Sequence, residues 1–297
     1  MMKTTFASEG LAGYINQNFI PVRFDAETRD TLIFKGKTYT NKGVGRRPKH
    51  ELANYLLNGK FSFPTIVYTD RKGNIYPVPG YKDVKSIEPY LIYFTESVYQ
   101  NRLPINNFVT DFMFANHDRF KKEIDEIKKT AQASNSSFTL PDSSGVVHWQ
   151  SFNEAAKKQS VDNKPLVVFI HTQRYYTCNL FEKMVLKNGV IADLLNNKYH
   201  PVKMNAAAQK DIEFMGKVFK SNGPGAPHQL TYALLKKSFV FPAVLVIDNK
   251  NQLAAELHAY MNTVQFESIM SFYADKNYTK KSYQEFVKPF KSKLQNQ

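Results

Sequence analysis

The chain has 297 residues, of which 42% are hydrophobic and 14% aromatic, and its formal net charge is +14. This composition supplies enough apolar side chains for a folded core, so it excludes a disordered chain. No apolar run approaches the length of roughly 18 residues that a membrane-spanning helix needs, and the opening M-M-K-T-T-F-A-S-E-G lacks the apolar segment of a signal peptide. The single cysteine, Cys178, excludes a disulfide bond within the chain and leaves the redox compartment open.

The basic charge has two interpretations. A positive surface attracts nucleic acid, anionic membranes or acidic protein partners. The lysines, however, are dispersed along the chain, and neither an RNP-like aromatic motif nor the spacing of zinc ligands accompanies them. We therefore favour lysines spread over solvated helix faces, and we expect no nucleic-acid motif.

The chain repeats itself at a nearly constant spacing. N-Q-N-F-I-P-V-R-F-D-A at 16–26 matches N-N-K-Y-H-P-V-K-M-N-A at 196–206, an offset of 180. F-S-F-P-T-I-V-Y-T-D at 61–70 matches F-V-F-P-A-V-L-V-I-D at 239–248, an offset of 178. Matches that persist over about 110 positions indicate two copies of one fold.

The first copy covers residues 1–112 and is shorter than the second. At the offset of 180, Met1 aligns with Phe181, so the first copy begins three residues after the position equivalent to Cys178. It has no counterpart of residues 148–180, which hold a predicted helix, a strand and the cysteine loop. We expect this copy to lack a central strand, so that it borrows a strand, exposes a sheet edge or packs abnormally. Pairing with another chain through an exposed edge, including a dimer, is a hypothesis.

Residues 113–145 connect the two copies. The segment 118–130, D-R-F-K-K-E-I-D-E-I-K-K-T, predicts an amphipathic helix with Phe120, Ile124 and Ile127 on one face. Residues 131–145 are rich in serine and turn-forming residues, which is typical of a linker. The second copy covers residues 146–297.

The second copy has a regular order of predicted elements. A helix is expected at 149–159, and the all-apolar strand at 166–170 follows, whose lack of alternation predicts burial on both faces. Helical segments are expected at 178–186 and 190–196, and a strand at 200–204 runs parallel to the first because a helix separates them. The later elements are a helix at 228–236, antiparallel strands at 243–247 and 252–257, and a last helix at 264–273. This order predicts an α/β fold, a mixed central sheet flanked by helices on both faces.

Three motifs of the second copy carry a family resemblance: W-Q-S-F-N-E-A-A-K-K-Q at 149–159, N-K-P-L-V-V-F-I-H-T at 163–172 and Y-Y-T-C-N-L-F-E-K-M at 175–184. They resemble the helix, first strand and W-C-x-x-C loop of bacterial thioredoxin-like proteins in the thioredoxin-fold superfamily. The first copy is similar to the later elements of that family, and its opening M-M-K-T-T-F resembles the end of a C-x-x-C-K-x-M-x-x-T-F segment. The resemblance covers nearly all of 1–112 and 146–290. It implies tandem thioredoxin-like domains, the first of them truncated at its N-terminus.

Pro64 and Pro242 follow phenylalanine at equivalent positions, each just before a predicted strand. By resemblance they match the family's cis-proline, which lies against the active loop. A plain turn is the alternative for any single proline before a strand. The F-x-F-P context shared by both copies favours the family position.

The active loop of the second copy holds Arg174, Tyr175, Tyr176, Thr177 and Cys178. A thioredoxin-type oxidoreductase needs two thiols, one that attacks and one that resolves the mixed disulfide. By resemblance, Cys178 matches the resolving cysteine, Tyr175 occupies the attacking position and Arg174 replaces the usual tryptophan. Because a phenol forms no disulfide, we expect no dithiol–disulfide cycle in this chain.

Two questions about this loop stay open in the sequence. Cys178 is either a small buried residue, as a lone cysteine of this kind often is, or a monothiol activated by Arg174 and a helix N-terminus. Arg174, Tyr175 and Tyr176 either form a protein-binding surface, in which such residues are frequent, or pack within the loop.

Other candidate sites are weaker. The seven histidines show no metal-ligand spacing, and His50 and His228, which share a repeat position, are predicted to begin helices rather than to bind metal. The segment G-V-G-R-R at 43–47 lacks the third glycine and the preceding strand of a nucleotide loop, so it predicts a basic turn. We expect neither a cofactor nor a metal.

Two functions remain. The first is a thioredoxin-like protein, redox-silent in this chain, whose second domain serves binding or structure. A C-x-x-C upstream of Met1 would make the intact protein a thiol–disulfide oxidoreductase, and the resemblance then implies a periplasmic or secreted location. The second is a non-catalytic protein-interaction scaffold throughout. Both predict a protein partner.

Overall fold

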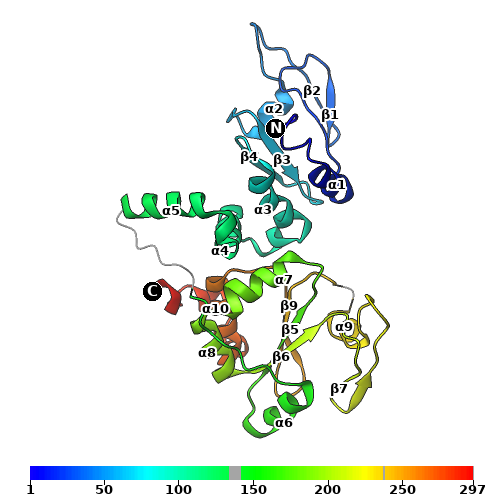
Figure 1. Ribbon diagram of the computed structural model, residues 1–297, viewed down its shortest axis with the longest axis vertical. Helices are drawn as coiled ribbons and strands as arrows, with labels where there is room; N and C mark the ends of the chain where they lie inside the picture. Colours follow the sequence, from blue (N-terminus) through cyan, green and yellow to red (C-terminus); the bar gives the residue numbers. More distant parts are fainter. Residues whose placement is uncertain (134–141, 237, 297) are drawn as a thin grey trace. The chain divides into compact units, whose positions relative to one another are not determined.

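The computed structural model describes residues 1–133, 142–236 and 238–296, and the chain divides into two compact units, 1–91 and 92–297 (Figure 1). The sequence repeat assigns residues 92–112 to the first copy, whereas they fold with the second unit. Of the predicted linker, residues 134–141 lie outside the described residues. In the described part of the chain, no helix has both the length and the apolar character that a bilayer crossing requires.

The first unit contains short helices and two separate antiparallel hairpins. β1 pairs with β2, and β3 pairs with β4. The β1–β2 hairpin is not predicted from the sequence, because strands of three residues carry too little alternation to be recognised. The elements are α1 (Glu9–Asn18), β1 (Leu32–Phe34), β2 (Lys37–Tyr39), α2 (Glu51–Leu57), β3 (Thr65–Thr69), β4 (Ile75–Pro79) and α3 (Val84–Thr95), which continues into the second unit.

The second unit begins with a helical segment that precedes its sheet. The elements of this segment are the 3₁₀ turns η1 (Val98–Asn101) and η2 (His117–Arg119), and the helices α4 (Ile105–Ala115) and α5 (Lys121–Ala133). The predicted helix 118–130 begins later than expected because η2 takes up its first residues. Phe120 and Ile124 are buried, as the amphipathic pattern predicts, and Ile127 is partly buried.

The sheet of the second unit has four strands in the order β10-β9-β5-β6. β5 runs parallel to β6 and antiparallel to β9, and β9 runs antiparallel to β10. As the sequence predicts, β5 and β6 are parallel and β9 and β10 form an antiparallel hairpin in one mixed sheet. The elements are α6 (Phe152–Asp162), β5 (Leu166–His171), α7 (Tyr176–Phe181), the π-helical turn η3 (Glu182–Leu186), α8 (Gly189–Lys198), β6 (His200–Asn205), β7 (Ile212–Phe214), β8 (Lys217–Phe219), α9 (Gln229–Leu235), β9 (Ala243–Ile247), β10 (Leu253–His258), α10 (Thr263–Ala274), η4 (Asn277–Thr279), α11 (Tyr283–Val287) and η5 (Lys293–Asn296).

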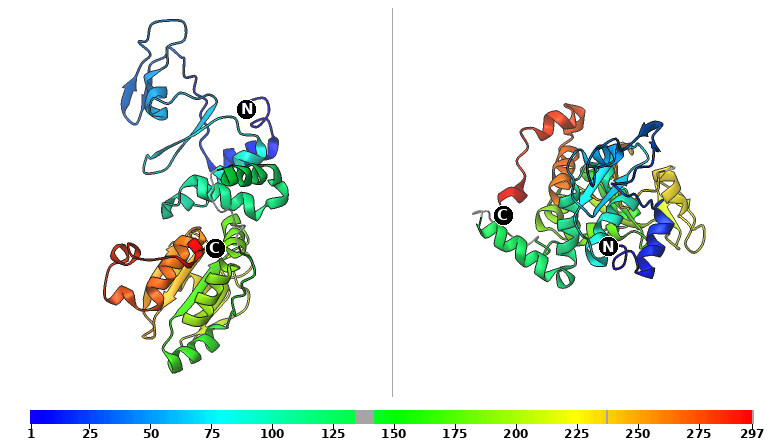
Figure 2. Two further views of the ribbon diagram at one scale, coloured as in Figure 1. Left: turned by 90° about the vertical axis from the view of Figure 1, so that its left-hand side faces the viewer. Right: turned by 90° about the horizontal axis from the view of Figure 1, so that it is seen from above.

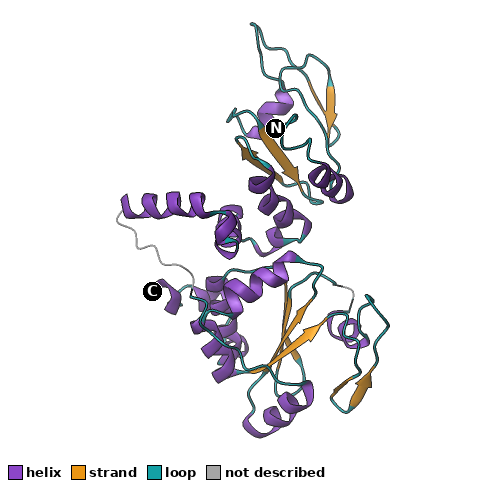
Figure 3. Cartoon of the chain, viewed as in Figure 1, coloured by secondary structure: helices purple, strands orange, loops and turns teal. Residues whose placement is uncertain are grey.

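Both faces of the central strand β5 are buried, as its unbroken apolar sequence predicts. Val167 and Phe169 pack in one cluster with residues of α7, α8 and α10. Leu166, Val168 and Ile170 pack in another with residues of α6 and α9. Each such side chain contributes about 1.5–3 kcal/mol through burial. Figures 1, 2 and 3 show helices on both sides of this sheet, so the predicted α/β class is confirmed.

Helix α6 begins later than the sequence predicts. The hydroxyl of Ser151 accepts a hydrogen bond from the N–H of Glu154, and the Glu154 carboxylate accepts one from the N–H of Ser151. This capping box satisfies two N–H groups that a helix start otherwise leaves unpaired. The helix therefore starts at Phe152 rather than at Trp149.

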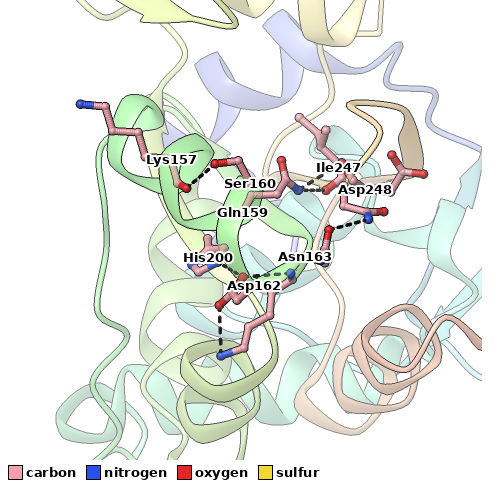
Figure 4. Close-up of polar contacts among 10 residues, drawn as sticks. Lys157, Gln159, Ser160, Asp162, Asn163, His200, Ile247 and Asp248 are labelled. Atoms are coloured by element: carbon pink, nitrogen blue, oxygen red, sulfur yellow. Dashed lines mark hydrogen bonds and ion pairs between the residues drawn. The ribbon is translucent and has the colours of Figure 1, made fainter.

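The C-terminal end of α6 is attached to the sheet by side-chain hydrogen bonds (Figure 4). The Gln159 amide donates to the carbonyl oxygens of Ile247 and Asp248, both at 3.1 Å. The carboxylate of Asp162 lies 2.8 Å from Nε2 of the buried His200. These contacts connect α6 to the end of β9 and to the start of β6.

Candidate functional site

The predicted active-loop residues lie at the N-terminus of α7. Tyr175 is the N-cap and has an extended backbone, while Tyr176, Thr177 and Cys178 form the first turn. Arg174 is exposed, and its N–H donates to the Thr172 hydroxyl at 3.3 Å. The loop thus joins the end of β5 to the N-terminus of a helix. In thiol enzymes, reactive cysteines are found at helix N-termini.

Cys178 is only 2% exposed and packs in the apolar cluster that contains α6 and α9. Burial raises the pKa of its thiol to about 12. At pH 7 only about 10⁻⁵ of such a thiol is ionised, and the thiolate is the reactive form. The sequence leaves open whether Cys178 is a small buried residue or an activated monothiol, and in the structure it is buried.

A carboxylate from a distant part of the chain binds the N-terminus of α7. Glu96 follows α3, is buried, and accepts hydrogen bonds from the backbone N–H groups of Tyr176 at 2.8 Å and Thr177 at 2.7 Å. A helix start leaves such N–H groups without intrahelical partners, and the helix dipole favours negative charge there. Glu96 therefore supplies the hydrogen-bond acceptor for two N–H groups at the start of α7.

Two opposing effects act on the Glu96 carboxyl group. Burial raises its pKa, and the hydrogen bonds from Thr177 and Tyr176 lower it. Burial is the larger effect, so the pKa is raised. The stability that Glu96 contributes through its titration is therefore full at acidic pH and declines as the pH rises through the raised pKa.

The residues 92–120, which we call the covering segment, also pack on the aromatic part of the loop. The ring of Tyr176 lies 4.9 Å from that of Phe112, and its hydroxyl accepts a hydrogen bond from the Asn116 amide. Phe112 is fully buried and contacts Phe120 edge to face at 5.8 Å. Tyr176, a candidate for a partner-binding surface, thus packs against residues of its own chain.

The peptide bonds Phe63–Pro64 and Phe241–Pro242 are both cis. In the second unit, the hydroxyl of Thr177 donates to the carbonyl oxygen of Phe241 at 3.3 Å. The ring of Tyr175 lies 5.7 Å from the ring of Phe241 in an edge-to-face arrangement. The residues before Pro242 therefore lie directly beside the active loop.

A second acid, Asp111, is partly buried and connects the covering segment to the end of β10. The carboxylate of Asp111, on α4, accepts a hydrogen bond from the hydroxyl of the fully buried Tyr260 at 2.9 Å. The amide of Asn101 donates to the carbonyl oxygens of His258 at 2.6 Å and Tyr260 at 3.0 Å. Burial raises the pKa of Asp111 to about 6.

We expect Asp111 to make the stability of the second unit depend on pH. Its folded-state pKa of about 6 exceeds the ordinary value of 3.8, so the folded protein holds a proton that the unfolded chain releases. The contribution is full below about pH 4 and is lost as the pH rises through about 6, a change of about 2–3 kcal/mol. Urea unfolding of the wild type and of Asp111→Asn between pH 4 and 7 measures it. A pH slope as steep in Asp111→Asn as in the wild type would contradict the prediction.

Sequence reasoning missed Glu96, Asp111 and Asn116. Their partners in the fold lie 80, 149 and 60 residues away along the chain, and none belongs to the active-loop motif. The aromatic run F-V-T-D-F-M-F at 108–114 was a signal that this segment packs against other aromatic residues. Because the repeat assigned that run to the first copy, its packing in the second unit was not predicted.

His50 and His228 begin helices α2 and α9, as the sequence predicts. In each, Nδ1 accepts a hydrogen bond from a backbone N–H two residues later, from Leu52 at 3.0 Å and from Leu230 at 3.1 Å. Among the residues that the structure describes, no group of three or more histidine, cysteine, aspartate or glutamate side chains is arranged to hold a metal ion.

Two cavities lie away from the active loop. One of about 990 Å³ is in the first unit, against β2, α2 and β4. The other, of about 440 Å³, lies in the second unit between the start of α6, β6 and β7. Neither is lined by a residue of the active loop.

No protein-family model and no curated protein matches the chain. Among solved structures, DsbH oxidoreductase is 18% identical, with a TM-score of 0.34 over 49% of this chain and 99% of that one. A thioredoxin-fold protein from Helicobacter pylori is 16% identical, with a TM-score of 0.34 over 46% of this chain and 91% of its own. The oxidised C-terminal domain of DsbD from Neisseria meningitidis is 16% identical, with a TM-score of 0.30 over 40% and 87%. At these identities the likeness concerns the fold alone.

Proposed function

We propose that the chain is a redox-silent thioredoxin-like protein whose second unit has a binding or structural role. The contact between Glu96 and the N-terminus of α7 carries this proposal, because a carboxylate of the chain itself fills the place of a catalytic thiolate. In support, Tyr175, which by resemblance takes the attacking position, is the N-cap of α7, and Cys178 is buried with a raised pKa. In this function the loop holds the covering segment instead of exchanging disulfides.

The proposal includes two copies of one fold, 1–112 and 146–297, joined by 113–145. In support, α1 and α8 are each ten residues long and begin 180 positions apart. The strands β3 and β9 are each five residues long and begin 178 positions apart. The helices α3 and α10 have twelve residues each.

A non-catalytic interaction scaffold throughout is the second candidate. The exposed side chain of Arg174 favours the scaffold. It is accessible to a partner, whereas the other residues of the active loop are partly or fully buried. The two candidates differ in what the active loop contacts. In the first, the loop binds the covering segment of its own chain. In the second, the loop binds another protein. Binding of a protein partner that Arg174→Ala abolishes would favour the scaffold.

We expect the chain to catalyse no reduction of insulin by dithiothreitol beyond the uncatalysed rate. The physical reason is that it offers one buried thiol of high pKa, where the reaction needs an exposed thiolate and a resolving thiol. Native Cys178 should also react slowly with a thiol reagent and rapidly after denaturation. Insulin reduction that is present in the wild type and lost in Cys178→Ser would contradict the proposal.

A further inference from the structure

The second unit contains a cavity of about 440 Å³ away from the active loop. Small-molecule pockets in proteins typically have volumes of about 300–1,000 Å³. The wall of this cavity is formed by residues 150–151, the start of α6, the strand β6, and the loop that leads from β6 into β7. The cavity therefore has room for a small molecule or for one side chain of another protein.

The most deeply buried residues that line this cavity are apolar. They are Phe152, Val202 and Met204, which are 6%, 1% and 3% exposed. The ring of Phe214 packs on that of Phe152 at 4.9 Å and holds it in place. An apolar group in contact with these side chains is shielded from water, and this shielding is favourable. A ligand that fits the cavity therefore has an apolar part.

Among the carboxylates that line the cavity, that of Glu213 has no cationic partner. Asp211 forms an ion pair with Lys220, at 2.6 Å. The ammonium group of Lys203 also lies 2.6 Å from a carboxylate, that of Glu182. Glu213 is exposed, and no basic side chain in the described part of the chain forms an ion pair with it. The cavity thus favours a cation over an anion at this position.

A buried acceptor of Gln150 also lacks a donor. The backbone N–H of Gln150 donates to the carbonyl oxygen of Pro201 at 2.8 Å, so this residue lies beside β6. Its side-chain oxygen Oε1 is buried and accepts no hydrogen bond from the described residues. Buried acceptors are almost always paired, and the terminal torsion of a glutamine turns readily. A ligand with N–H groups in the cavity would supply the missing donor.

We propose that this cavity binds an alkylammonium group. The aliphatic chain lies against the buried apolar side chains, and the ammonium group donates to the carboxylate of Glu213, which the amide of Asn153 orients through a hydrogen bond of 3.0 Å. The remaining N–H groups of the ammonium suit the side-chain oxygen of Gln150. A free primary amine and the lysine side chain of another protein share this chemistry. The site is independent of the active loop, since no residue of that loop lines the cavity.

The test titrates the full isotope-labelled chain with hexylamine and follows the backbone amide shifts by NMR. Saturable shifts are expected at the residues of α6, β6 and β7 that line the cavity. Hexanol has the same carbon chain without the charge and should bind about threefold more weakly. A second titration uses N-acetyl-lysine N-methylamide. Tighter binding of this probe than of hexylamine assigns the site to a lysine side chain of a protein, and weaker binding assigns it to a free amine.

Variants test the two parts of the site. Glu213→Gln removes the charge at an exposed position, and it should weaken hexylamine binding about threefold. Ala208→Phe places a ring in the cavity and should abolish saturable binding. Glu126→Gln removes an exposed carboxylate from α5 and should bind hexylamine as the wild type does. Amide spectra that are unchanged outside the cavity show that each variant is folded.

The proposal is overturned if hexylamine produces no saturable shifts, or if the shifts lie outside the cavity. Equal binding of hexylamine and hexanol, or of the wild type and Glu213→Gln, overturns it as well, because the charge then has no part in recognition. Should Ala208→Phe not fold, Glu213→Gln still decides, since an exposed side chain is changed there. None of these readouts depends on insulin reduction, so the redox-silent function stands or fails separately.

Discussion

Phe112→Ala is expected to destabilise the second unit by about 3–5 kcal/mol. Phe112 is fully buried, and its ring contacts those of Phe108, Phe120 and Tyr176. Truncation removes apolar contacts and leaves a cavity among rigid rings that cannot easily close. Urea unfolding followed by the fluorescence of Trp149, the single tryptophan, reports on this unit.

Two variants control this measurement. Phe112→Leu retains much of the buried volume and should lose less stability than the alanine variant. Phe63→Ala removes a ring that is about half exposed in the first unit, and it should leave the Trp149 transition unchanged. A loss below about 1 kcal/mol in Phe112→Ala would show that the covering segment is not part of the core of the second unit.

Glu96→Ala has the second large expected effect, a loss of about 2–4 kcal/mol in the free energy of unfolding of the second unit. The substitution leaves the N–H groups of Tyr176 and Thr177 without acceptors at a buried helix start. It also removes a negative charge that the helix dipole favours. The transition is measured at pH 7 with the same Trp149 signal.

Glu96→Gln separates the hydrogen bond from the charge. Its side-chain oxygen can accept from one N–H, while its NH₂ group meets the other, so the loss should lie between zero and that of Glu96→Ala. Glu126→Ala, at an exposed glutamate on α5, should change stability by no more than about 0.5 kcal/mol. Equal stability of Glu96→Ala and Glu126→Ala would rule out a structural role for the carboxylate.

The strands of the second unit could be predicted because local sequence carries their pattern. The strand predicted at 243–247 has the bounds of β9, and the strand predicted at 166–170 differs from β5 by one residue. Both lie in the sheet interior and are apolar throughout, a pattern that a short window reveals. The strands β7 and β8 have three residues each and show no such pattern. They are recognised as strands only because they pair with each other across a tight turn.

The candidate site was predictable only in part. The motif around Cys178 placed the loop after a strand and at a helix start, and the structure has it there. The compact units divide at Leu91, although the repeat extends the first copy to residue 112. The predicted repeat compares residues along the chain, whereas compactness depends on which apolar surfaces meet, so the two divisions need not coincide.

The sequence by itself determined that this chain has one cysteine, Cys178, three residues after Tyr175, because neighbouring residues can be read directly along the chain. It also determined the α/β class, since periodicity is a local property. Only the tertiary structure decided that Cys178 is buried and that Glu96 binds the N-terminus of α7. Both depend on groups that folding brings together from distant positions in the chain. Desolvation by such groups raises the pKa of the Cys178 thiol, and the distant Glu96 accepts the hydrogen bonds at the start of α7.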